Sequence, residues 1–291
     1  MKGIKMEHIG ISTSAVLVDL GISTWTARKL DKKVSEEIDE TKGTKARAGN
    51  YHKKLFAGDA ILENITKFVT QVRSYHYSVT LPWTDGGTRL LPMGKFMEYN
   101  TKIQEYEAEF NSYKQQFLDK YNEMVSAAAF TLGEMFNRED YPEPEEIMHK
   151  FNFKYDFAPV PQAGDFRIDI ENEGKNELIK NFEDKFQQRV AEAMKDAWVR
   201  LHECLSRMSE RLDFADGDTK KIFRDSLVDN AIELVDLLKA LNITKDPELE
   251  TLRKKLEQAM FGVSAKELRD DGSLRKQVKS EVDSILSKIS L

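Results

Sequence analysis

The N-terminal third of the chain carries the residues with the clearest binding chemistry. Lys and Arg side chains alternate with aromatic ones between Lys42 and Arg89. Single-stranded nucleic acid is bound by this combination, because cations follow the phosphate backbone while rings stack on the bases. We therefore predict that this segment binds single-stranded DNA. The predicted phosphate partners are Lys42, Lys45, Arg47, Lys53, Lys54, Arg73 and Arg89, and the predicted stacking rings are Tyr75, Tyr77 and Trp83.

The distribution of charge supports this prediction but has a second interpretation. Residues 1–95 hold 15 Lys and Arg against 10 Asp and Glu, whereas the remainder holds 29 against 40. A basic segment can face a polyanion while an acidic remainder limits indiscriminate adhesion. The alternative is that charge varies by chance along an acidic helical protein, in which case these cations form a solvated face.

Four common sequence patterns of catalytic and cofactor sites are missing. The chain has no G-x-x-x-x-G-K-[ST] or G-x-G-x-x-G loop for phosphates, no HExxH motif and no G-x-S-x-G nucleophile elbow. Its five His residues are scattered, and the single Cys204 falls on an apolar helical stripe, where we expect a buried packing residue. We expect no catalytic residue, no metal and no cofactor.

One enzymatic alternative remains open. The pattern Glu173-Gly174-Lys175 follows a predicted strand at Phe166–Ile170, with Asp165 and Asp169 nearby. Metal-dependent nucleases use carboxylates to hold Mg²⁺ and a lysine to assist the attacking water. Acidic residues before a helix are, however, also expected from the helix dipole alone. We therefore expect a non-enzymatic protein.

Two long helices dominate the predicted fold. Apolar residues recur every three or four positions over Met93–Phe136 and again over Lys175–Asp213. Neither helix can bury its stripe alone, so we expect the two to pack as a long antiparallel hairpin. Period-two patterns predict strands before Ile22 and in a central segment, residues 151–171. The expected fold is mainly α, with a small antiparallel sheet from N-terminal and central strands.

The remaining segments complete a three-part division: 1–95, 96–213 with its two-stranded insertion, and 214–291. The pattern predicts a mobile loop or short helix over Asp31–Asn50, a helix over Tyr51–Val79 and an irregular loop over Leu81–Pro92. Another short helix is expected over Glu145–Lys150. Helix-start signals in the C-terminal part are Asp216-Gly217-Asp218, Asp246-Pro247 and Ser264–Glu267, and a turn at Asp270–Ser273 precedes a last amphipathic segment.

The expected setting is the cytoplasm. A single cysteine excludes an intramolecular disulfide and favours a reducing compartment. No window approaches the roughly 18 apolar residues of a membrane-spanning helix, so we expect no membrane partner. Long helices with apolar stripes favour self-association, and we therefore expect a homo-oligomer.

Several short motifs occur in an order typical of one family. They are Leu20–Leu30, Gly87–Pro92, Asp140-Tyr141-Pro142, Phe151-Asn152-Phe153, Phe223–Asn230 and Leu241–Pro247. In this order the chain resembles a family of bacteriophage and integrative-element proteins labelled only as a domain of unknown function. The resemblance implies a bacterial host cell, and genes near DNA recombination genes and a MoxR-type ATPase. It implies no catalytic residues. The alternative function is thus a helical adaptor or assembling subunit of that ATPase system.

Overall fold

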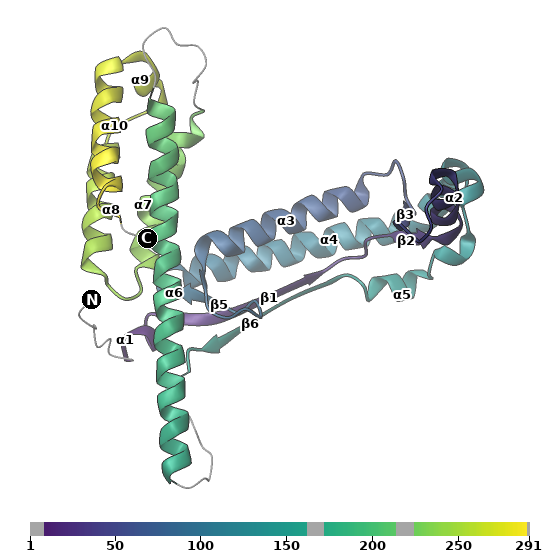
Figure 1. The fold of residues 1–291 in the computed structure, drawn as a ribbon, viewed down its shortest axis with the longest axis horizontal. Coiled ribbons are helices and arrows are strands. Elements are labelled where there is room, and N and C mark those ends of the chain that lie inside the picture. The colour runs from purple at the N-terminus through teal and green to yellow at the C-terminus, as the bar shows by residue number, and fades with distance from the viewer. Residues whose placement is uncertain (1–8, 162–171, 214–223, 290–291) are drawn as a thin grey trace. The chain divides into compact units, whose positions relative to one another are not determined.

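The computed structural model describes residues 9–161, 172–213 and 224–289, and the chain divides into two compact units (Figure 1). Unit 1 comprises Met1–Asp19, Tyr77–Tyr99 and Asp156–Leu291, and unit 2 comprises Leu20–His76 and Asn100–Tyr155. Each boundary falls inside a helix or strand. These four elements are β1 (Ala15–Ser23), α3 (Ile61–Val79), α4 (Met93–Leu132) and β6 (Asn152–Pro159).

The predicted fold class is confirmed: helices dominate and the β-structure is small and antiparallel. The main sheet has the order β4-β5-β1-β6, with β4 at Leu81–Pro82 and β5 at Arg89–Pro92. N-terminal and central strands therefore share one sheet, as expected. The second predicted central strand, Phe166–Ile170, lies outside the described residues.

The segment Leu81–Pro92 is more regular than the predicted loop. Its ends pair with each other, Leu81 with Leu90, and β5 pairs antiparallel with β1, from Ala15 opposite Pro92 to Val18 opposite Arg89. A turn joins β4 to β5, and in it Gly87 adopts a φ of 101°, which glycine tolerates best. The expectation of an irregular loop was wrong because Leu81 and Leu90 are fully buried, so pairing and burial override the two prolines.

Unit 1 is built on α6 (Asn172–Leu212), a helix of 41 residues. Its aliphatic stripe, including Val190, Ala197 and Leu205, is fully buried. The C-terminal helices and β4 cover this stripe, with α7 and α10 packing directly on α6 (Figure 1). The short helix α1 spans Ile9–Ser12, and the C-terminal helices are α7 (Ser226–Leu241), α8 (Pro247–Met260), α9 (Ala265–Asp270) and α10 (Gly272–Leu286).

Two of the predicted helix starts are confirmed in atomic detail. The Asp246 carboxylate accepts from the backbone N–H groups of Glu248 and Leu249, and Pro247 follows at the first helical position. Ser264 and Glu267 form a reciprocal capping box. The third predicted start, Asp216-Gly217-Asp218, lies outside the described residues.

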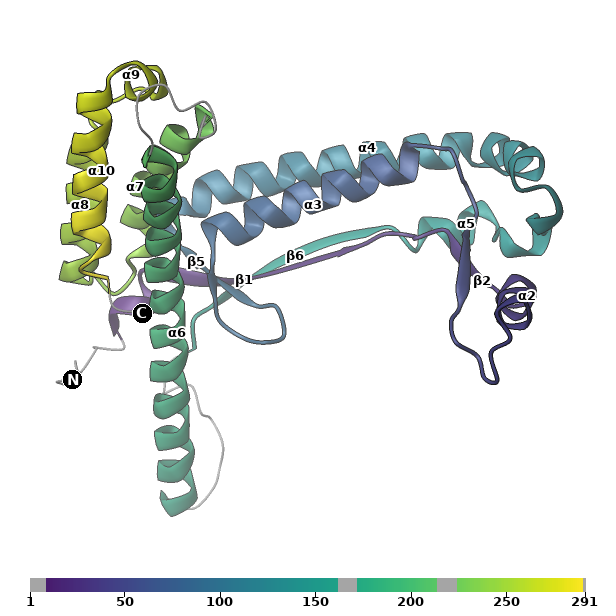
Figure 2. The same ribbon diagram turned by 45° about the horizontal axis from the view of Figure 1, so that its top comes forward.

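The expected hairpin between the two long helices was wrong, because each helix finds other partners in its own unit. In unit 2 the aromatic stripe of α4 packs on α3, where the Phe68 ring lies 5.2 Å from that of Tyr113. The same stripe packs on β6, with the Phe110 and Phe153 rings 5.5 Å apart. Figure 2 shows α3 alongside α4. Aromatic rings therefore fill the space beside α4, whereas aliphatic side chains of the C-terminal helices fill that beside α6.

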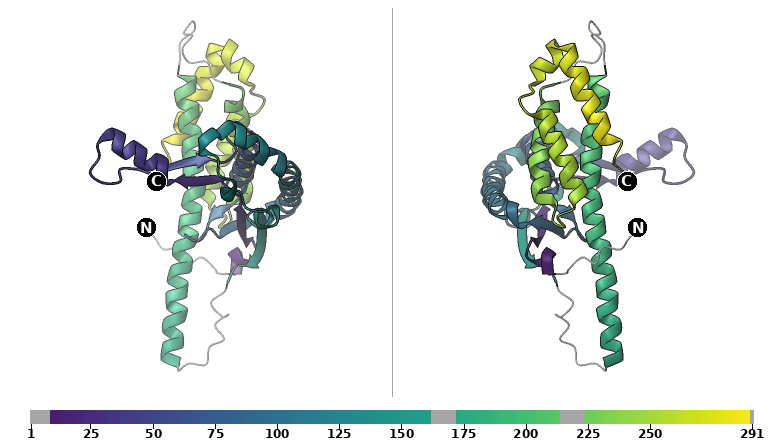
Figure 3. Two further views of the ribbon diagram at one scale, coloured as in Figure 1. Left: turned by 90° about the vertical axis from the view of Figure 1, so that its right-hand side faces the viewer. Right: turned by 90° about the vertical axis from the view of Figure 1, so that its left-hand side faces the viewer.

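Unit 2 also contains a separate two-stranded sheet, with a helix in the connection between its strands. We define the ribbon module as β2 (Arg28–Asp31), α2 (Lys32–Lys42) and β3 (Tyr51–Lys54), whose strands pair antiparallel (Figures 1 and 3). The Asp31 side chain caps α2 by accepting from the Val34 N–H, and Gly43 ends the helix at a φ of 66°. The predicted helix over Tyr51–Val79 thus begins only at Ile61, after this strand.

The loop that follows α4 completes unit 2. It contains two 3-10 turns, Gly133–Met135 and Arg138–Asp140, and the short helix α5 (Pro144–Met148), which matches the predicted short helix. The Tyr141 hydroxyl donates to the Leu55 carbonyl at 2.8 Å, and the Tyr121 hydroxyl donates to the Pro142 carbonyl at 2.7 Å. Burial raises the pKa of both phenols to about 12. These bonds fasten the loop between α4 and β6 to the rest of unit 2.

Candidate nucleic-acid interface

The ribbon module concentrates exposed positive charge. Between Arg28 and Lys54 the chain has nine Lys and Arg against five Asp and Glu, a net charge of +4. Lys42, Lys45 and Arg47 are all exposed, at the end of α2 and in the loop that follows. Within the described ranges no carboxylate pairs with Lys42 or Lys45, and Arg47 makes only a surface pair with Glu36 at 3.5 Å. Surface pairs of this kind hold a cation weakly.

Lys53 and Lys54 are neighbours on β3 and have opposite environments. Successive side chains of a strand point to opposite faces. Lys54 is exposed, with a surface pair to Glu63 at 3.7 Å. Lys53 is only 6% exposed, and its Nζ lies 2.8 Å from Asp140 and 3.7 Å from Asp31, and donates to the Met135 carbonyl. The predicted phosphate contact by Lys53 is therefore corrected, because its ammonium is buried and already partnered.

Arg73 and Tyr75 serve mainly to tie α3 into unit 2. The Arg73 guanidinium donates to the Ile22 carbonyl at 2.9 Å. The Tyr75 ring is half-buried and packs edge-on against Tyr106, with 5.7 Å between ring centroids. The predicted stacking surface of Tyr75 is thus partly covered by α4.

The other predicted site residues, Tyr77, Trp83 and Arg89, belong to unit 1. Trp83 is 4% exposed and lies edge-on to Phe186 at 5.4 Å, so the prediction that it stacks on bases is corrected: its ring is part of the core. Arg89 donates to the Thr80 hydroxyl at 2.6 Å and lies over the Tyr77 ring at 4.9 Å. Burial lowers the pKa of Arg89, which nevertheless stays protonated as arginines do in proteins.

A cation that the sequence prediction omits, Arg200, fixes the backbone where α3 ends. Arg200 of α6 donates to three backbone carbonyls at the end of α3, those of Tyr77, Ser78 and Thr80, and pairs with Asp196 at 2.7 Å. The last carbonyls of a helix lack partners within the helix, so Arg200 acts as a cap. Its partners lie about 120 residues away in the sequence, and no local signal could reveal them.

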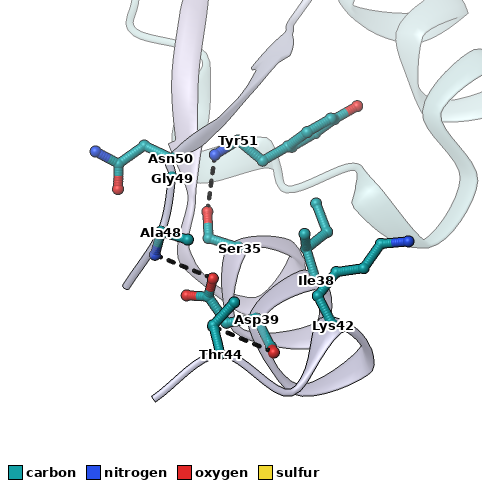
Figure 4. A pocket seen from close by; sticks show the side chains of 9 residues that line it. All are labelled: Ser35, Ile38, Asp39, Lys42, Thr44, Ala48, Gly49, Asn50 and Tyr51. Atoms are coloured by element: carbon teal, nitrogen blue, oxygen red, sulfur yellow. Dashed lines mark hydrogen bonds between the residues drawn. The ribbon is translucent and has the colours of Figure 1, made fainter. Parts of the chain in front are cut away.

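The ribbon module also contains a pocket that the sequence prediction misses (Figure 4). Its volume is about 280 Å³. The largest apolar side chains lining it are those of Ile38, 46% exposed, and Tyr51, 39% exposed. The available signal was the position of Tyr51 within the basic and aromatic stretch. The pocket is lined by Ser35, Ile38, Asp39, Lys42, Thr44, Ala48, Gly49, Asn50 and Tyr51.

Hydrogen bonds hold this pocket in shape. The Ser35 hydroxyl donates to the Asp31 carbonyl at 2.6 Å and accepts from the Tyr51 N–H at 2.9 Å. The Asp39 carboxylate accepts from the Ala48 N–H at 3.2 Å. The two bonds of Ser35 join α2 to the start of β3, and the bond of Asp39 holds the connecting loop against α2.

Metal-ligating side chains do not cluster in the described part of the chain. Within ranges 9–161, 172–213 and 224–289, no three His, Cys, Asp or Glu side chains gather as a metal site would require. The nuclease alternative is not addressed by the structure, because Asp165, Asp169 and the side chains of Glu173 and Lys175 lie outside its described part. Burial raises the pKa of Cys204 to about 11, which disfavours its reactive thiolate and agrees with a packing role.

Comparison with known proteins adds the family. Among the described helices, none is both long and apolar enough to cross a bilayer. Neither the curated proteins nor the solved structures include a match to the chain. One family model, described as a protein of unknown function (DUF3150), matches residues 13–212, from just before β1 to the end of α6. Since this match covers more than half of the chain, the chain belongs to the DUF3150 family.

Proposed function

We propose that the protein binds single-stranded nucleic acid, DNA in the first place, without catalysis, and that the ribbon module is its binding surface. The supporting observation is the exposed charge of this module. The side chains of Lys42, at the end of α2, and of Lys45 and Arg47, in the loop that follows, are all exposed to solvent. Cations placed in this way follow a phosphate backbone and release counterions when they bind it.

The strand register of the ribbon adds a second supporting observation. Arg28 and Lys54 are directly opposite each other, as are Lys29 and Lys53. Like charges in such pairs destabilise a sheet. Asp140 lies within 3.8 Å of Lys29 and 2.8 Å of Lys53, so it compensates one pair. Among the residues that the structure describes, the other pair, on the opposite face, has only the weak contact of Lys54 to Glu63, and a bound phosphate would relieve its repulsion.

The test is a fluorescence-anisotropy titration with labelled single-stranded DNA, duplex DNA and RNA of equal length, at two salt concentrations with magnesium. Wild-type protein should bind a single-stranded probe with steep salt dependence. Lys42→Glu/Lys45→Glu should weaken binding on the order of tenfold and lower the salt slope by about 1.4, the value for two phosphate contacts on a single strand. A matched control is Lys67→Glu/Lys120→Glu, which reverses two exposed charges elsewhere in unit 2.

Three results would contradict the proposal. The first is that no probe binds at low salt, and the second is that both double variants bind equally well. A probe shortened during the titration would point instead to the nuclease alternative, which requires loss of cleavage in Glu173→Ala and Lys175→Ala.

A bacteriophage or mobile-element origin, and a bacterial cytoplasm as the location, belong to the same proposal and rest on the family resemblance.

The ATPase partnership is a second proposal. The supporting observation is Phe261, 87% exposed between α8 and α9, in the C-terminal part that follows the family match. Co-purification with the ATPase that is lost in Phe261→Ser would support it. Deleting Asp271–Leu291 would be a poor test, because Val282 and Ile285 of α10 belong to the core of unit 1.

A further inference from the structure

We infer that the pocket between α2 and residues 44–51 receives one base of the bound strand, stacked on Tyr51 and Ile38. The adjoining phosphates would lie on Lys42 and Lys45. This inference rests on the proposed function and deepens it, because it assigns the stacking role to a different ring from those predicted. The sequence places Tyr75, Tyr77 and Trp83 in that role, and the structure leaves Tyr51 better suited to it.

The exposure of the two apolar side chains is the first argument. Ile38 is 46% exposed although it lies on a helix that packs against the ribbon, and Tyr51 is 39% exposed although it belongs to a paired strand. Of the residues of α2, only Ser35 is buried. Figure 4 shows the side chains of Ile38, Lys42 and Tyr51 extending to the same side, so an apolar surface with a cation at its rim faces solvent.

The preformed backbone is the second argument. Because Ser35 bonds both Asp31 and Tyr51, the Tyr51 backbone is held in place without any ligand. A ring on a backbone that is already positioned loses less conformational freedom when a base stacks on it. The Asp39 carboxylate is directed to the Ala48 N–H, on the other side of the helix from Lys42 in Figure 4. A phosphate on Lys42 would therefore lie away from this carboxylate.

The size and charge of the pocket select the class of ligand. Its volume of about 280 Å³ is just below the range of roughly 300–1,000 Å³ typical of drug-sized ligands, so it suits a single flat ring system. Three cations lie in or next to it: Lys42 lines the pocket, and Lys45 and Arg47 belong to the adjoining loop. An aromatic surface beside several cations is complementary to a base with its flanking phosphates.

The experiment compares two probes and four proteins. One probe is a labelled single strand of about 12 nucleotides, within the usual range of site sizes. The other has the same phosphates and an abasic backbone. The proteins are wild type, Tyr51→Leu, Tyr51→Phe and, as a control with a more exposed ring in unit 1, Tyr77→Leu. Circular dichroism and thermal melting establish that each variant is folded, and sedimentation establishes its oligomeric state.

The expected result is a loss of about tenfold in affinity for the normal probe in Tyr51→Leu, with little change in Tyr51→Phe or Tyr77→Leu. The salt slope should stay that of wild type, because no phosphate contact is removed. The abasic probe should bind wild type and Tyr51→Leu equally. If Tyr51→Leu is unfolded, Ile38→Ser provides the same comparison.

The failures of the inference and of the proposed function are distinct. Salt-dependent binding that is lost in Lys42→Glu/Lys45→Glu but unchanged in Tyr51→Leu overturns the inference and leaves the proposed function intact. No binding of any probe by wild type overturns both. A change of oligomeric state in Tyr51→Leu without a change in affinity would identify the pocket as a self-association surface, and would also overturn the inference.

Discussion

The strand pairs β2–β3 and β4–β5 each carry residues of the predicted site and do different work. Both are short and antiparallel, and each has a cation in a strand and an aromatic ring: Tyr51 begins β3, and Trp83 directly follows β4. The β4–β5 pair belongs to a four-stranded sheet, where Trp83 is 4% exposed and Arg89 bonds Thr80. The β2–β3 pair forms its own sheet, where Tyr51 is 39% exposed and Lys54 faces solvent. Coverage by neighbouring elements decides which of these rings and cations remain available for a ligand.

The largest expected effect contrasts the two rings. Trp83→Ala should lower the free energy of unfolding of unit 1 by about 3–5 kcal/mol, because it removes a large buried side chain and leaves a cavity beside Phe186. Tyr51→Ala should stay within about 0.5 kcal/mol of wild type, since a half-exposed ring leaves no cavity. Denaturant unfolding followed by circular dichroism measures both. Equal losses in the two variants would break the comparison.

The next effect contrasts Lys53 with Lys54. Lys53→Met keeps the packing of the side-chain stem but leaves Asp140 and Asp31 without their buried partner, so we expect a loss of about 3 kcal/mol in the stability of unit 2. The value is at the lower end for a broken buried pair because Lys29 remains 3.8 Å from Asp140. Lys54→Met is the control, for which a change below about 1 kcal/mol is expected. A stable Lys53→Met protein would show that Lys53 does not hold the ribbon.

The smallest effect concerns Tyr141, which bonds Leu55 just after the ribbon. Its pKa is raised to about 12 in the folded protein, against about 10 in an unfolded chain. A raised pKa means that the folded state holds the proton more tightly. The associated stability is therefore complete below about pH 10 and is lost as the pH rises through 12.

Tyr141→Phe should cost about 1 kcal/mol at neutral pH through the lost hydrogen bond, and it should make stability fall less steeply between pH 10 and pH 12. Unfolding measured across this range, together with an absorbance titration of the tyrosines, tests this. An identical alkaline fall in wild type and variant would show that the Tyr141 phenol titrates normally.

The features that the sequence predicts well depend on neighbouring residues. The start of α8 follows from Asp246 and Pro247 next to each other, and that of α9 from Ser264 and Glu267 three residues apart. The periodicity of α6 likewise predicts its buried stripe, although Cys204, which we expect to be buried, is only partly buried against this core. These are local rules, which need no knowledge of the partner that covers the helix.

The features that were missed depend on distant partners. Strand alternation indicates that Lys53 and Lys54 face opposite sides, but only the position of Asp140 shows which side is closed. The burial of Trp83 depends on Phe186 of α6, more than a hundred residues later. The same holds for the two long helices, whose stripes reveal that each needs a cover and not which element provides it. The sequence therefore indicates a region for the candidate site, and the structure decides which residues in that region are accessible.

The position of the unit boundaries has a consequence for synthesis of the chain. Because the chain passes between the units inside β1, α3, α4 and β6, neither unit can be released as an uninterrupted fragment. Unit 2 is nevertheless complete once Tyr155 has left the ribosome, whereas unit 1 still lacks α6 and the helices that cover it. Vectorial synthesis thus allows the ribbon module and its supporting helices to fold first, while the N-terminal strand β1 waits for the last helices to close its own core.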